Sequence, residues 1–68
     1  MNLEAVIEGL LFVVGEDGLT LDQLVKATGE SLETVKDALT HLREEYESPN
    51  RGIRIHFLGN TFKLTTKA

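Results

Sequence analysis

The residues of this sequence that could take part in catalysis are two histidines and a short run of glutamates. His41 and His56 could act as general acids or bases or bind a metal, and Glu44, Glu45 and Glu47 could supply carboxylates. The histidines stand fifteen positions apart, which matches no metal-binding spacing, and the glutamates fall at the end of a predicted exposed helix. The sequence contains no cysteine, nucleophile elbow or phosphate loop. We therefore predict a protein that is not an enzyme and takes no metal, cofactor or small-molecule substrate.

The length of the chain limits how it can be stabilised. Its 68 residues suffice for one domain with one small core. A chain of this size hides only about 60% of the surface that it exposes when unfolded. Disulfides and metals are the usual additional stabilisers, and the sequence predicts neither. Association with a partner chain is the stabiliser that remains.

The composition is that of an ordinary globular domain, 41% hydrophobic and 26% charged. No apolar run approaches the roughly 18 residues that a membrane span needs. The N-terminal residues lack the basic leading segment of a signal peptide and include Glu4 and Glu8. We therefore expect a cytoplasmic protein with no membrane partner.

Three helices are predicted before the only proline of the chain. Apolar residues recur with a helical period in three segments, residues 3–14, 20–28 and 32–47. Each segment follows a residue type that favours the N-cap or begins with one: Asn2, Thr20 and Ser31. Thr20 and Gln23 also match a capping box, and only Gly29 and Glu30 separate the second helix from the cap of the third. A short helix, a glycine turn and a longer helix indicate a helix-turn-helix.

After Gly52 the apolar period changes to two, which predicts a β-hairpin around a turn at Gly59-Asn60. This turn implies the cross-strand pairs Leu58–Thr61, Phe57–Phe62, Ile55–Leu64 and Ile53–Thr66. The predicted fold is mainly α with a β-hairpin, a winged helix-turn-helix of three helices plus a two-stranded wing, formed as a single domain by residues 1–68. The residues expected at the centre of its core are Leu10, Leu39, Leu42, Ile55 and Phe57, and Leu32 is expected to face inward at the start of the third helix.

The distribution of charge bears on nucleic-acid binding. Residues 1–50 contain eleven acids and three bases, a net charge of −8, whereas residues 51–68 contain four bases and no acid. The third helix, which would read DNA in a helix-turn-helix, has a net charge of −3 over residues 31–48. Arg51, Arg54 and Lys63 of the wing could contact phosphates, so we expect DNA binding that is at most weak and non-specific. A DNA-binding winged helix of a transcription regulator remains the alternative function, and a purely structural fragment a third.

The first helix carries more apolar surface than its core stripe requires. The stripe covers an arc of about 140° at 100° per residue. Ala5, Gly9 and Phe12 lie on another side of the helix, and Val13 lies between that side and the core stripe. These four residues are the candidate interface of a homodimer. The competing interpretation is that Phe12 packs under the wing of its own domain.

Several segments, taken in their order and spacing, resemble the N-terminal winged-helix domain of the ScpB family (segregation and condensation protein B). They are Leu3-Glu4-Ala5, Leu10-Leu11-Phe12 through Gly15-Glu16, Leu42-Arg43-Glu44-Glu45-Tyr46 and Arg51-Gly52-Ile53. The resemblance implies a bacterial cytoplasmic protein with two winged-helix domains, of which this chain would be the first. It also implies a homodimer that binds the kleisin ScpA, and through it the SMC ATPase, in a condensin that condenses and segregates chromosomes. On this reading the protein is an interaction subunit without an active site, associated with the nucleoid through the complex.

Overall fold

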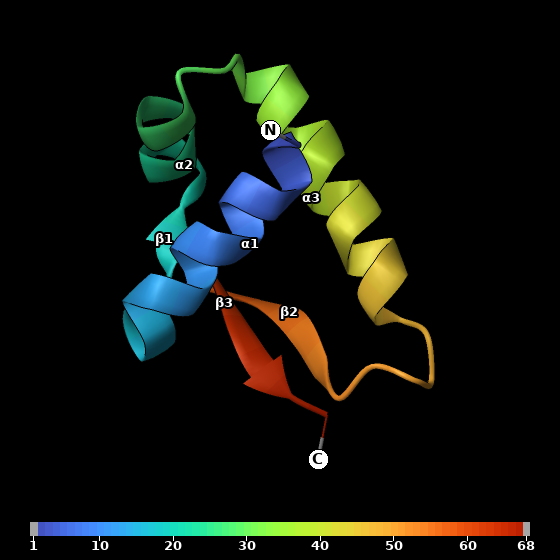
Figure 1. The fold of residues 1–68 in the computed structure, drawn as a ribbon. Helices are drawn as coiled ribbons and strands as arrows, with labels where there is room; N and C mark the ends of the chain where they lie inside the picture. Colours follow the sequence, from blue (N-terminus) through green and yellow to red (C-terminus); the bar gives the residue numbers. More distant parts are fainter. Residues whose placement is uncertain (1, 68) are drawn as a thin grey trace.

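The computed structural model describes residues 2–67, which form three helices with a small β-sheet at one end (Figure 1). In chain order the elements are α1 (Leu3–Val14), the 3-10 turn η1 (Gly15–Asp17), β1 (Leu19–Thr20), α2 (Leu21–Thr28), α3 (Leu32–Tyr46), β2 (Ile53–Leu58) and β3 (Thr61–Thr66). Helix α1 contacts α2, α3 and β3, so it joins the helical layer to the sheet. The winged helix-turn-helix predicted from the sequence is confirmed.

The helices begin and end where the local chemistry predicts. The Asn2 side chain accepts a hydrogen bond from the backbone N–H of Glu4 at 2.8 Å and caps α1. The capping box of α2 is complete, because Thr20 and Gln23 each accept the other's backbone N–H, at 3.1 and 2.9 Å. Gly29 ends α2 in the left-handed conformation that glycine adopts without strain.

The hairpin has the predicted register, with all four expected pairs present between β2 and β3. The sequence did not indicate the third strand, β1, whose Leu19 and Thr20 pair with Phe62 and Thr61 and extend the sheet to the order β1-β3-β2. Two residues are too few to show an alternating pattern, and their partners lie far away along the chain. Gly18 makes this approach possible, because its φ is 66° and a Cβ there would lie 2.7 Å from the carbonyl oxygen of Phe62.

The core lies where α1, α2, α3 and β2 meet, and its buried residues are Ile7, Leu11, Leu24, Val35, Ala38, Leu39, Leu42, Tyr46 and Ile55. Of the five residues predicted at its centre, Leu39, Leu42 and Ile55 are buried, while Leu10 is half-buried against the cluster.

Two predictions of burial are wrong. Phe57 is 54% exposed, because it lies one pair from the end of the hairpin, past the core. Its ring packs at a tilt against the ring of Phe62, with the two centroids 4.7 Å apart. Leu32 is 48% exposed, because it is the first residue of α3 and precedes the part of the helix that packs on the core. Both residues are on the predicted face of their element, but each lies near the end of that element, where the packing partners stop.

Candidate interaction surfaces

One candidate surface is the side of α1 that faces away from the core. Its predicted interface residues Ala5, Gly9, Phe12 and Val13 are all exposed, Phe12 at 78% and Val13 at 80%. The competing prediction, that Phe12 is buried under the wing, is wrong for the single chain. A Cβ at Gly9 would meet no atom within 4 Å, so packing inside this chain does not require glycine at that position.

This side of α1 borders the sheet and forms with it a shallow apolar groove of about 280 Å³. The residues that line it are Ala5, Glu8, Gly9 and Phe12 of α1, Ile53 of β2 and Leu64 of β3. Val13 lies outside the groove, next to Phe12. The sequence placed Ile53 and Leu64 on the apolar face of the hairpin, but only the packing of α1 on β3 brings them beside Phe12.

A polar cluster that includes Glu8, one of the residues lining the groove, holds α1 against α3. The Tyr46 hydroxyl donates a hydrogen bond to the Glu8 carboxylate, and the Arg51 guanidinium lies over the Tyr46 ring, 5.9 Å from its centroid. Burial raises the pKa of the Tyr46 hydroxyl well above its usual range, and the hydrogen bond and charge of Glu8 raise it further. Tyr46 therefore stays protonated and donates to Glu8, which fixes the edge of α1 that carries the groove.

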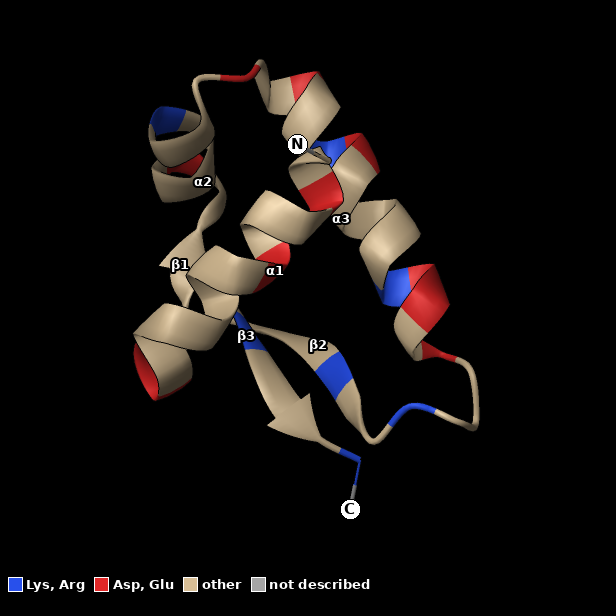
Figure 2. Cartoon of the chain, viewed as in Figure 1, with Lys and Arg blue, Asp and Glu red and all other residues tan. Residues whose placement is uncertain are grey.

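The three predicted nucleic-acid contacts do not share one environment. Arg51 is exposed above Tyr46, Arg54 is exposed on β2, and Lys63 is half-buried on β3. Acidic residues lie on all three helices, and α2 and α3 also carry basic ones, whereas the charged residues of the hairpin are all basic (Figure 2). All five acids of the third-helix segment, Glu33, Asp37, Glu44, Glu45 and Glu47, are exposed. The helix that would enter a DNA groove thus presents negative charge to solvent.

The structure places the two candidate catalytic histidines on different elements. His41 is exposed and lies 3.6 Å from a Glu4 carboxylate oxygen through Nδ1, while His56 is on β2, opposite Lys63. Among residues 2–67 no three histidine, aspartate or glutamate side chains are arranged to hold a metal ion. None of the described helices has the length and apolar character needed to cross a membrane.

Comparisons of the sequence with known proteins point to one family. The family model of the segregation and condensation complex subunit ScpB matches residues 5–68. Segregation and condensation protein B of Oceanobacillus iheyensis is 47% identical over 66 residues, and that of Enterococcus faecalis is 43% identical over 68 residues. The matches cover 97% and 98% of this chain but 34% of each relative, so the chain spans about a third of their length.

Two solved structures have the same fold. A crystal structure of a dimer of the ScpB N-terminal domain complexed with an ScpA peptide has a TM-score of 0.92 and 34% identity, and the match covers 94% of this chain and 74% of that one. ScpB from Mycobacterium tuberculosis has a TM-score of 0.84 and 27% identity, and the match covers 97% of this chain and 41% of that one. With the family model matching nearly every residue and the fold in agreement, the chain belongs to the family of the segregation and condensation complex subunit ScpB.

Proposed function

We propose that this chain is the N-terminal winged-helix domain of a two-domain ScpB and that it works as a dimerisation and interaction module of a bacterial condensin. In this role it pairs with a second copy of itself, contacts the kleisin ScpA, and through ScpA joins the SMC ATPase in chromosome condensation and segregation. The observation that carries the proposal is the exposure of Phe12, 78%, beside an apolar groove in a domain whose structural neighbour is a dimer with an ScpA peptide.

The surface of α1 has the chemistry of a two-fold interface. Phe12 is the anchor, since buried aromatic side chains dominate the binding energy of many interfaces. The open space at Gly9 allows the partner's backbone to approach closely. A two-fold axis lets each Phe12 enter the groove between α1 and the sheet of the other copy. The accessible surface of the chain is 4705 Å², of which a standard interface of about 800 Å² per partner would use roughly a sixth.

The rest of the proposed role follows from family membership. A subunit that holds proteins together needs no active site, so we propose that the chain is not an enzyme and uses no cofactor or small-molecule substrate. A bacterial chromosome lies in the cytoplasm, so a protein that condenses it works there, without a membrane partner. The acidic surface of α3 argues against the transcription-regulator alternative, because phosphates would be repelled from the helix that should read the bases.

The self-pairing is tested by changing Phe12→Glu and measuring sedimentation of the native and variant chains at the same high micromolar concentration. We expect a native dimer and a folded variant monomer, because a residue exposed at 78% contributes little to folding, whereas two buried glutamates would repel each other. Phe57→Glu is the matched control, since it places the same charge at a phenylalanine exposed at 54% and outside the groove. It should remain a dimer. A native chain that sediments as a monomer contradicts the proposal.

Binding to the kleisin is tested separately by capturing purified ScpA with the chain as bait. The proposal expects ScpA to be retained, and circular dichroism of the bait establishes that it is folded. If the folded native chain retains no ScpA, alone or with the remainder of its ScpB, the condensin role is wrong even if the chain dimerises.

A further inference from the structure

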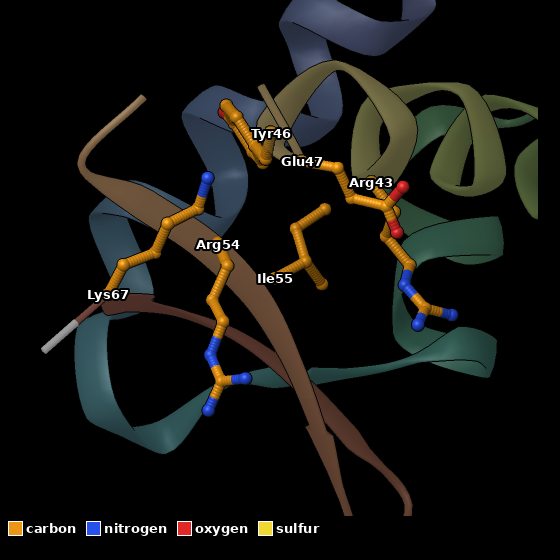
Figure 3. Close-up of a pocket in the computed structure, with 6 residues that line it drawn as sticks. All are labelled: Arg43, Tyr46, Glu47, Arg54, Ile55 and Lys67. Carbon is orange, nitrogen blue, oxygen red and sulfur yellow. The ribbon is translucent and has the colours of Figure 1, made fainter. Parts of the chain in front are cut away.

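A second pocket, separate from the groove on α1, lies between the end of α3 and the hairpin (Figure 3). Its volume is about 410 Å³, and its lining residues are Arg43, Tyr46, Glu47, Arg54, Ile55 and Lys67. Three of these six side chains are basic and one is acidic, in a protein whose net charge is −4. The bases come from three places along the chain: the last turn of α3, the second residue of β2, and the residue after β3 ends.

The two arginines of this pocket are available to a ligand. Among the ion pairs of residues 2–67, neither Arg43 nor Arg54 takes part, and both side chains are exposed. In Figure 3 their guanidinium groups lie on either side of Ile55. Arginine presents a planar set of donors that matches a carboxylate, so each of the two can bind one carboxylate with paired hydrogen bonds.

Lys67, on one side of the pocket, is held in place by two hydrogen bonds. Its backbone N–H donates to the Gly52 carbonyl oxygen at 2.9 Å, and its ammonium group donates to the Ser48 carbonyl oxygen, also at 2.9 Å. These bonds hold the segment after β3 against the loop that joins α3 to β2. The lysine therefore adds a positive charge at a fixed position.

The base of the pocket is apolar. Ile55 is 7% exposed and Tyr46 is 2% exposed, and both belong to the hydrophobic core. An apolar base between separated guanidinium groups suits a side chain of a peptide whose neighbours carry carboxylates. It does not suit a bare anion, for which the hydrocarbon surface offers no partner.

We propose that this pocket binds an acidic segment of a partner protein, with glutamate or aspartate side chains on Arg43 and Arg54 and an apolar side chain on Ile55. A nucleic-acid backbone fits the same bases less well, because Glu47 lines the pocket and the exposed Glu44 stands beside Arg43 on α3. A duplex long enough to reach both arginines would also meet these carboxylates, whereas a peptide can place its acidic groups between them. No residue is shared with the α1 groove, so the inference does not depend on self-pairing.

The experiment is an NMR titration of the ¹⁵N-labelled chain with a short peptide in which pairs of glutamates alternate with pairs of leucines. We expect the largest shift changes at the backbone amides of Arg43, Glu47, Arg54, Ile55 and Lys67, and an affinity that falls as salt is added. Arg43→Glu and Arg54→Glu should each weaken binding roughly tenfold, because an attraction becomes a repulsion at an exposed site. Lys26→Glu is the control, since it makes a similar charge change on α2, outside the pocket, and should bind as the native chain does.

Three results would overturn the proposal. The first is equal binding of a peptide in which glutamine replaces every glutamate, because carboxylates would then be irrelevant. The second is a set of shift changes that lies outside the pocket or survives both arginine substitutions. The third is a duplex DNA of arbitrary sequence that shifts the same amides with higher affinity than the peptide. The spectra of the variants report directly whether each is folded, and the two arginine substitutions test the pocket independently.

Discussion

Replacing Leu39 by alanine tests the packing of the core on which both surfaces rest. Leu39 is 3% exposed in the middle of α3, within the hydrophobic cluster that α1, α2 and β2 complete. Leu39→Ala removes three carbon atoms, worth about 2.4 kcal/mol of transfer free energy at about 0.8 kcal/mol per buried methylene. The cavity left behind adds to this cost, which reaches about 2–5 kcal/mol in measured series of such substitutions.

A loss of this size is large for so small a chain. A domain of this length has a free energy of unfolding of only about 5 kcal/mol. We therefore expect the midpoint of a circular-dichroism melt to fall by more than about 10 °C. Both proteins are compared at one concentration, because self-pairing would make the midpoint depend on it.

Leu32→Ala is the matched control, because it makes the same change in the same helix at a residue that is 48% exposed. Because about half of this side chain is already in water, the substitution loses only about half of the transfer free energy, and the free energy of unfolding should fall by about 1 kcal/mol. Equal losses in the two variants would refute the difference in burial between the middle of α3 and its first residue. An unchanged melt for Leu39→Ala would refute the core itself.

Three further predictions concern other parts of the molecule. The pKa of Tyr46 is raised above its ordinary value of about 10. The stability that this group contributes is therefore complete below about pH 10 and is lost as the pH rises further. Tyr46→Phe should flatten this alkaline decline in urea melts recorded over a pH series. Gly18→Ala should lower the melting midpoint much more than Gly15→Ala. Both glycines have positive φ, but only at Gly18 would a Cβ meet a backbone oxygen, 2.7 Å away. Similar midpoints for the two variants would contradict the close approach of β1 to β3. Duplex DNA should bind weakly, without sequence preference, and with a log–log salt slope of roughly 0.9 per phosphate contact, whereas a sequence-specific dissociation constant of about 10⁻⁸ M in fluorescence anisotropy would contradict the interaction-module function.

The elements of the fold could be predicted from the sequence because their signals are local. An N-cap acts on a backbone N–H two or three residues away, as at Asn2 and Thr20, so a short segment contains all the information that its helix end needs. The turn at Gly59-Asn60 is equally local, and the two-residue period then determines the register of the whole hairpin. The same periodicity predicted that Phe12 lies off the core stripe of α1, where the structure has it exposed.

The candidate interaction surfaces could not be predicted from the sequence, because they depend on tertiary structure. Periodicity assigns a side chain to a face, but not to a position along the neighbouring element, which is why Phe57 and Leu32 were expected in the core and are exposed. The pairing of β1 with β3 joins residues about forty positions apart in the sequence, and no local pattern indicates which distant strand a short segment will pair with.

The two candidate sites have the same origin. The groove on α1 exists because Ile53 and Leu64 pack beside Phe12, and the basic pocket exists because the fold brings Lys67 and Arg54 to the end of α3 beside Arg43. Charge counts along the chain separate an acidic part from a basic one, but they carry no distances. Only the packing of the hairpin on α3 decided that Arg43, from the acidic part of the chain, lines a pocket together with Arg54 and Lys67 from the basic part.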